Sequence, residues 1–147
     1  TAIVADYFGI AVTLDQFSGQ WITLDEESIT HIGTDNNQLG INTVAGARVW
    51  DNQCKVRLQL GPLTFAQFQQ FLPVGNAYQP LIDLVRYLLG MELDFDVQLI
   101  LKAEEVPTCT FIDDLLPQLG WTCWLKTEPF DADDNQVIVT ELINQER

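Results

Sequence analysis

The sequence predicts an α+β protein with two similar small β-rich units, related by internal duplication and joined by a helical pair. Three observations predict this class. Polar and apolar residues alternate in several short stretches, as they do in strands with one buried face. Apolar residues recur at helical spacing between two of these stretches. Landmarks of the first half also return in the second half, in the same order, about 80 residues later.

The first predicted unit covers residues 1–62. The chain starts without methionine, in a helical pattern that ends at Gly9, so we expect it to be a piece of a longer protein. Two alternating stretches follow, IAVTLDQF at 10–17 and NQCKVRLQLG at 52–61. The second stretch places Cys54 on its apolar face, which predicts a buried, inert thiol there.

Residues 63–89 are predicted to form the two connecting helices. The first helix has Thr64 as its N-cap and stops at Pro73. The second helix has Asn76 as a candidate N-cap and ends at Gly90. Apolar residues recur every three to four positions in both, so each helix is expected to present one face to a core.

The second predicted unit covers residues 90–147, with strands at 91–101 and 135–142. In the stretch GMELDFDVQLIL, apolar residues alternate with four polar ones. The polar members are Glu92, Asp94, Asp96 and Gln98. We interpret their face as solvated or partner-facing, because the first unit carries no such cluster of carboxylates.

The proposed duplication is supported by matched landmarks. Three pairs match at offsets of 81, 80 and 83 residues: Gly9 and Gly90 before a strand, the Leu-Gly pairs that end at Gly40 and Gly120, and the Asp-Asn-Gln triplets at 51–53 and 134–136. A single shared tripeptide is expected by chance. An ordered series at nearly one offset indicates a repeat.

The composition excludes several classes of function. The chain has 21 acidic and 7 basic residues, for a net charge of −14. Such an excess repels phosphate backbones and anionic lipid surfaces, which argues against binding to nucleic acid or to a membrane surface. Three cysteines and one histidine, with no CxxC pair, indicate neither a disulfide framework nor a zinc site. They favour a reducing, cytosolic compartment. No apolar run is long enough to span a bilayer.

Motifs for catalysis or for metal binding are incomplete. DADDN at 131–135 begins like a calcium loop, with Asp131 and Asp133 as the first ligands. Gln136 and Leu142 then stand where such a loop needs glycine and glutamate. GxSxG, GxGxxG and Walker patterns do not occur. We therefore expect no enzyme, no cofactor and no metal site.

Apolar and aromatic residues are concentrated in two stretches that are predicted to be loops. Tryptophan and arginine dominate protein interfaces, because they bury a large area and also carry a polar group. The predicted partner-binding residues are Val44, Arg48, Trp50, Trp121, Trp124 and Leu125. For any single tryptophan, burial in the core of the chain itself remains the more frequent explanation.

Several stretches resemble one known family. LGINTVAGARVWDNQCKVRLQLGPLTFAQFQQFLPVG, LVRYLLGMELDFDVQLILKAEEVP and LGWTCWL are similar to the carboxyl-terminal part of TssG, a baseplate component of the bacterial type VI secretion system. The resemblance implies a structural subunit that forms the baseplate wedge with TssF and TssE and docks trimers of TssK. It also implies a cytoplasmic location, in a baseplate docked at the inner membrane.

Combined with the duplication, the resemblance predicts that loops 41–52 and 121–134 each engage one TssK trimer. Two alternatives stay open. One is a stand-alone acidic β-rich protein-binding module. The other is a carboxylate-dependent hydrolase that uses Asp94 and Asp96.

Overall fold

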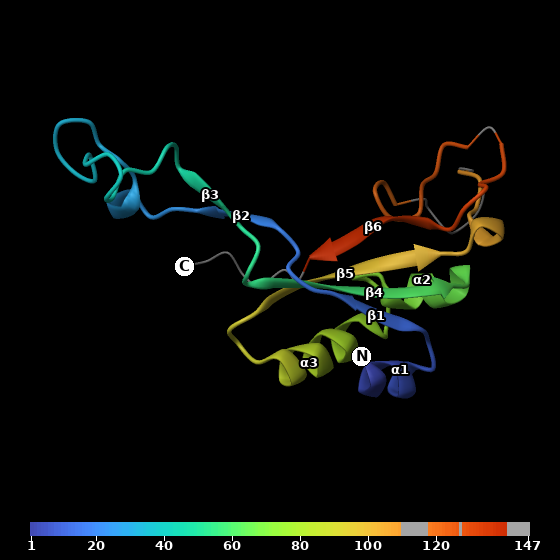
Figure 1. Cartoon of the computed structure of the whole chain (residues 1–147). Coiled ribbons are helices and arrows are strands. Elements are labelled where there is room, and N and C mark those ends of the chain that lie inside the picture. Colours follow the sequence, from blue (N-terminus) through green and yellow to red (C-terminus); the bar gives the residue numbers. More distant parts are fainter. Residues whose placement is uncertain (110–117, 127, 141–147) are drawn as a thin grey trace. The chain divides into compact units, whose positions relative to one another are not determined.

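The computed structural model describes residues 1–109, 118–126 and 128–140. The chain divides into two compact units, shown in Figure 1. Unit 1 comprises residues 1–16 and 56–147, and unit 2 comprises residues 17–55. The α+β class is confirmed. The division into segments 1–62, 63–89 and 90–147 concerns a repeat along the sequence and stays a prediction.

A four-stranded sheet forms the centre of unit 1, in the order β1-β4-β5-β6. Strand β1 (Val12–Asp15) runs antiparallel to β4 (Lys55–Leu63). Strand β5 (Asp94–Leu101) runs antiparallel to β6 (Asp134–Thr140). The arrows of β4 and β5 point in the same direction in Figure 1, so the central pair is parallel. Parallel neighbours need a crossover connection, which two of the helices supply.

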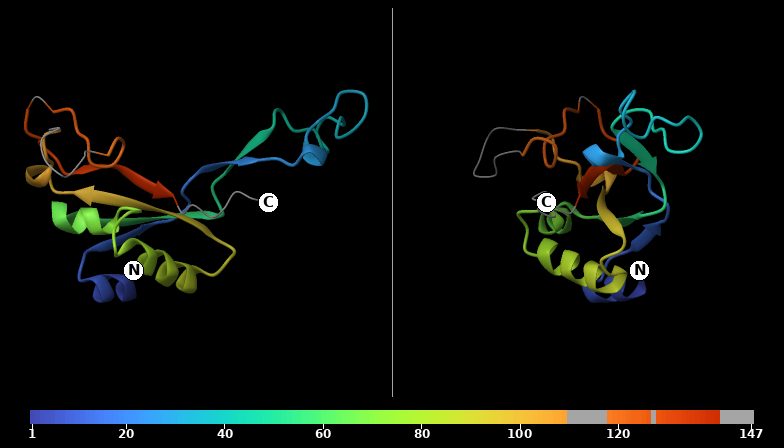
Figure 2. Two further views of the ribbon diagram at one scale, coloured as in Figure 1. Left: turned by 180° about the vertical axis from the view of Figure 1, so that it is seen from behind. Right: turned by 90° about the vertical axis from the view of Figure 1, so that its left-hand side faces the viewer.

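Three α-helices accompany this sheet: α1 (Ala2–Phe8), α2 (Phe65–Phe71) and α3 (Tyr78–Leu89). Helices α2 and α3 connect β4 to β5, and α1 and α3 lie on one side of the sheet in both views of Figure 2. A short 3-10 helix, η2 (Ala103–Glu105), follows β5. Within the described residues, no helix has both the length and the apolar character needed to cross a bilayer.

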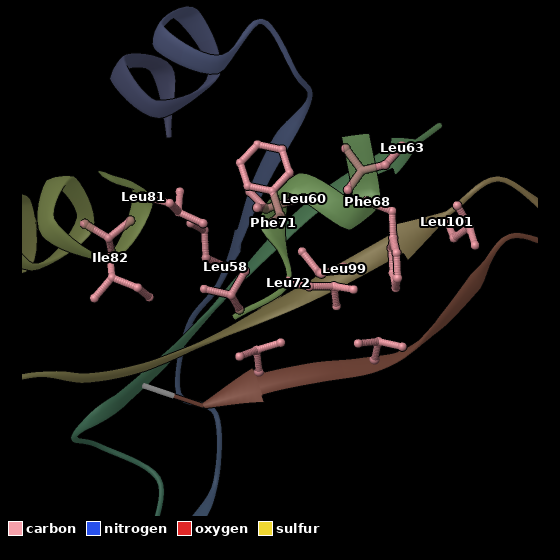
Figure 3. Close-up of a cluster of buried hydrophobic side chains, with 14 of the residues drawn as sticks. Leu58, Leu60, Leu63, Phe68, Phe71, Leu72, Leu81, Ile82, Leu99 and Leu101 are labelled. Atoms are coloured by element: carbon pink, nitrogen blue, oxygen red, sulfur yellow. The ribbon is translucent and has the colours of Figure 1, made fainter. Parts of the chain in front are cut away.

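The hydrophobic core lies between the helices and the sheet, and Figure 3 shows part of it. The side chains with no measurable exposure are Leu60, Leu63, Phe68, Leu81, Leu99 and Leu101. Each such side chain contributes about 1.5–3 kcal/mol relative to its exposed form. All buried apolar residues of the described chain belong to unit 1.

The predicted helix ends are confirmed at two positions and wrong at a third. Thr64 caps α2 in a capping box, in which its side chain and that of Gln67 each accept a backbone N–H of the other residue. Gly90 ends α3 at a φ of 77°. The N-cap of α3 is Ala77 instead of Asn76, because the Ala77 carbonyl accepts the first helical hydrogen bond, from Leu81.

The prediction that Glu92, Asp94, Asp96 and Gln98 form a solvated or partner-facing polar face is wrong for the last two residues, which lie on β5. Asp96 is 1% exposed and Gln98 is 8% exposed. Arg57 of β4 donates to both carboxylate oxygens of Asp96, from Nε at 2.7 Å and from Nη2 at 2.8 Å. Gln98 Nε2 donates to the Asn135 carbonyl at 2.7 Å. Strand β5 is central in the sheet, so neighbouring strands supply the partners that permit burial of its polar side chains.

The prediction that Cys54 is a buried thiol on a strand is also wrong, because Cys54 is exposed and precedes β4. It belongs to a turn in which the Asp51 carboxylate accepts the backbone N–H groups of Gln53 and Cys54, at 3.2 Å and 3.1 Å. These two hydrogen bonds lower the pKa of Asp51 from its ordinary value, since they favour the charged form.

Unit 2 contains a two-stranded hairpin that the sequence did not predict. Strand β2 (Gln20–Thr23) pairs antiparallel with β3 (Arg48–Asp51), and the 3-10 helix η1 (Glu26–Ser28) lies between them in the chain. The sequence pattern predicts a loop over residues 41–52, and this prediction is wrong for residues 48–51, which form β3. Trp21 and Trp50 face each other across the hairpin, with ring centroids 5.3 Å apart and an edge-to-face geometry.

Candidate interaction surface

A turn in unit 2 presents an exposed leucine. The backbone N–H groups of Ile41 and Asn42 donate to the Gln38 carbonyl at 3.1 Å and 3.2 Å. The Asn42 side chain accepts the Gln38 N–H at 3.0 Å and closes the turn. Gly40 has a φ of 80°, which glycine adopts without strain. Leu39 is 91% exposed at the tip of this turn. We call residues 38–42 the first leucine turn.

A second turn, in unit 1, has the same construction. The backbone N–H groups of Trp121 and Thr122 donate to the Gln118 carbonyl at 3.1 Å and 2.9 Å. The Thr122 hydroxyl accepts the Gln118 N–H at 2.8 Å. Gly120 has a φ of 82°, and Leu119 is 92% exposed. We call residues 118–122 the second leucine turn.

The two leucine turns agree in every feature that defines them. Each begins with glutamine, has leucine and glycine next, and is closed by a short polar side chain four residues after the glutamine. Each turn therefore has its own hydrogen-bond network, and the two networks present Leu39 and Leu119 to solvent in the same local geometry. Neither leucine is buried in the described chain, so both side chains are accessible to a partner.

Sequence reasoning noted both Leu-Gly pairs as landmarks of a repeat but did not include Leu39 and Leu119 among the contact residues. The Leu-Gly pair could have indicated these exposed leucines. Leucine before a glycine with positive φ lies at the apex of a turn, and apex side chains have few neighbours in their own chain.

The predicted contact residues near the first leucine turn differ in exposure. Trp50 is 54% exposed and Arg48 is exposed, whereas Val44 is half-buried. Trp50 lies against Gly19, where a Cβ atom would collide with the indole ring. Together with Trp21, which is 62% exposed, Trp50 forms an aromatic face on the hairpin of unit 2.

Near the second leucine turn, the predicted contact residues divide in a similar way. Leu125 is 95% exposed, Trp121 is half-buried against the core, and Trp124 is 8% exposed. Trp124 Nε1 donates to Asp134 at 2.9 Å, and its ring packs against Phe68 with centroids 5.7 Å apart. Trp124 therefore packs in the core of this chain, which is the more frequent role of a single tryptophan.

The acidic stretch 131–135 provides hydrogen-bond acceptors to unit 1. Asp133 accepts the backbone N–H of Ala103 at 3.0 Å, and Asp134 accepts the indole N–H of Trp124. Among residues 1–109, 118–126 and 128–140, no group of three or more acidic, histidine or cysteine side chains could hold a metal ion.

The fold resembles two solved assemblies. One is titled "Structure of the type VI secretion system TssK-TssF-TssG baseplate subcomplex revealed by cryo-electron microscopy"; a chain in it matches with a TM-score of 0.72 and 22% identity, over 100% of this chain and 63% of that one. The other, "The baseplate complex from the type VI secretion system", matches with a TM-score of 0.58 and 25% identity, over 100% of this chain and 43% of that one. No curated protein matches. The present chain thus spans less than two thirds of either matched chain.

The fold is therefore shared with chains of type VI secretion baseplate assemblies. The family model for "Type VI secretion, TssG" matches residues 1–126. The chain belongs to the TssG family.

Proposed function

We propose that this chain is the part of a TssG subunit that docks two TssK trimers onto the baseplate wedge, one at each leucine turn. The observation that carries the proposal is the shared construction of the two turns. A surface that occurs twice in one chain suits a partner that occurs twice in the assembly, and homo-oligomeric partners present identical surfaces.

The size of the expected contact follows from the exposed side chains. Leu39 and Leu119 are almost fully exposed, and docking would bury each of these side chains. Burial of one leucine contributes about 2 kcal/mol to binding, which changes the affinity about thirtyfold. Trp50 would add aromatic area to the first contact, and Leu125 would add apolar area to the second. Arg48, Val44, Trp121 and Trp124 stay as predicted contact residues; of these, Arg48 is the exposed one.

Partnership with TssF and TssE is part of the same proposal and rests on family membership. Both partners would hold the subunit in the wedge, in a cytoplasmic baseplate docked at the inner membrane, while the leucine turns face TssK. The role is structural. The hydrolase alternative needs Asp94 and Asp96 as a reactive pair, but Arg57 binds both oxygens of Asp96.

The test measures how much TssK each variant retains. The full subunit is co-expressed with TssF, TssE and TssK, and the copies of TssK are counted by native mass spectrometry. We expect Leu39→Asp and Leu119→Asp each to lose one TssK trimer and the double variant to lose both, since a carboxylate cannot enter an apolar pocket without a large desolvation cost.

Met91→Asp serves as the matched control, because Met91 is 83% exposed and lies outside both turns. All variants should unfold cooperatively at the wild-type temperature. Trp124→Ala is unsuitable as a probe, since it removes a core side chain. Retention of the full complement of TssK by the double variant would refute the docking proposal.

A further inference from the structure

Two cysteines of unit 1 lie side by side, although they are 14 residues apart in the chain. Cys109 Sγ and Cys123 Sγ are 2.9 Å apart, within hydrogen-bonding distance of each other. Both residues are half-buried, and both carry reduced thiols. The low cysteine content favoured unpaired thiols throughout the chain, so this pair was not predicted.

The backbone around the two thiols holds them opposite each other. The Cys109 N–H donates to the Trp124 carbonyl at 3.3 Å, so this hydrogen bond joins one cysteine to the residue that follows the other. Trp124 and Val106 are buried in the core, and the Lys126 ammonium group donates to the Val106 carbonyl. Two hydrogen bonds, together with the burial of Val106 and Trp124, thus fix the separation of the two segments independently of the sulfur atoms.

We propose that Cys109 and Cys123 form a reversible disulfide, with a low-molecular-weight disulfide such as oxidised glutathione as the oxidant. One protein thiol loses its proton to solvent and attacks a sulfur of glutathione disulfide, releasing one glutathione thiolate, which takes up a proton. The second protein thiolate then attacks the mixed disulfide and releases the second glutathione. Two protein thiols and one glutathione disulfide become one protein disulfide and two glutathione molecules.

The pH dependence of this exchange follows from the contact between the thiols. The hydrogen bond with Cys123 raises the pKa of the Cys109 thiol above its ordinary value. The thiolate is the attacking species, so exchange starting at Cys109 should be slow at neutral pH and should accelerate as the pH rises toward that raised pKa.

The disulfide would close the segment that carries the second leucine turn, because residues 118–122 lie between the two cysteines. This covalent bond beside residues 118–122 restricts the conformations of the second leucine turn and so preorganises it. This consequence rests on the proposed function, whereas the bond itself does not. Failure of the disulfide to form would leave the docking of TssK untouched.

Trypsin separates the relevant thiols into two peptides. Cleavage after Lys102 and Lys126 yields residues 103–126, which contain both cysteines of the pair, and cleavage after Arg48 and Lys55 yields residues 49–55, which contain Cys54. The full folded chain is equilibrated in glutathione buffers of increasing oxidised fraction, trapped with acid and digested. We expect peptide 103–126 to become lighter by two hydrogen atoms, while peptide 49–55 gains one glutathione.

The exposed Cys54 is an internal reference for a thiol without a second cysteine in its peptide. The pair should oxidise at about a tenfold lower concentration of glutathione disulfide than Cys54 requires, because the second step is intramolecular. Cys123→Ser should replace the loss of two hydrogens in peptide 103–126 by a single glutathione adduct on Cys109. Cys54→Ser should leave the oxidation of the pair unchanged.

Two results would overturn the inference. The first is a peptide 103–126 that stays reduced, or that carries two glutathione adducts, under conditions that fully modify Cys54. The second is an equal yield of the disulfide from the chain unfolded in urea, because the folded contact would then contribute nothing to bond formation.

Discussion

At the scale of single residues, Asp96 shows how a carboxylate on a central strand stabilises the fold through an ion pair. It lies two residues from the exposed Asp94 on the same strand, yet it is almost completely buried. Arg57 satisfies both of its oxygens, and this ion pair raises the pKa of Arg57. Burial of one partner is tolerated because the geometry is bidentate.

Asp96→Asn should destabilise the protein by about 3 kcal/mol, the lower end of the cost of breaking a buried ion pair, since the Arg57 side chain is 26% exposed and can recover some hydration. Urea unfolding followed by tryptophan fluorescence measures the change. Asp94→Asn is the matched control and should shift the free energy of unfolding by less than about 0.5 kcal/mol. Equal effects of both changes would show that the ion pair contributes nothing specific.

At the scale of elements, α2 depends on its cap. It has only seven residues, too few to be stable in isolation, and its first turn is closed by the Thr64 capping box. Thr64→Ala should lower the free energy of unfolding by about 1 kcal/mol, because it leaves the Gln67 N–H without its acceptor. The exposed Thr108 offers a control outside any helix. A thermal melt of both variants measures the difference; an unchanged melting temperature for Thr64→Ala would contradict the role of the cap.

The same scale shows what could be predicted from the sequence. Strands β1, β4, β5 and β6 and both connecting helices were predicted, because each carries its own alternation or helical period. The hairpin of β2 and β3 was missed, since each strand has four residues and the Trp21–Trp50 pairing joins positions far apart in the chain. The alternation of polar and apolar residues also predicts that Asp96 is exposed. It cannot reveal Arg57, which permits the burial of Asp96 and lies 39 residues away on another strand.

The two leucine turns that we propose as the contact surface could not be selected from residue types alone. Tryptophan is a residue type that often binds partners, which is why the sequence suggests Trp124. Its side chain is buried in the core, and its contact with a partner stays a prediction. Leu39 and Leu119 are exposed, but leucine is a common residue that does not by itself indicate a contact surface. They become distinctive only through the hydrogen bonds of their turns, which a residue count does not reveal.

At the scale of the whole molecule, unit 2 lacks a core of its own. None of the buried residues belongs to 17–55, and its sheet has two short strands. An isolated two-stranded hairpin is at best marginally stable in water. If TssK docks as proposed, we expect unit 2 to gain much of its stability from that contact.

Hydrogen exchange measures this expectation. In the chain without TssK, amides of β2 and β3 should exchange rapidly, while those of β4 and β5 stay protected. Addition of TssK should slow exchange in unit 2 at least about tenfold and leave β4 and β5 unchanged, because only the weakly stable unit can gain protection. Strong protection of unit 2 before TssK is added would show that the hairpin is stable by itself.

The parallel arrangement of β4 and β5 has a mechanical consequence. Segment 17–55 leaves the sheet at the start of β4, and segment 102–133 leaves it at the end of β5, so the two attachment points are at opposite ends of the central pair. Tension pulling on both segments would load the hydrogen bonds between these strands in shear. Many bonds would then share the force at once, instead of opening one after another as in a zipper.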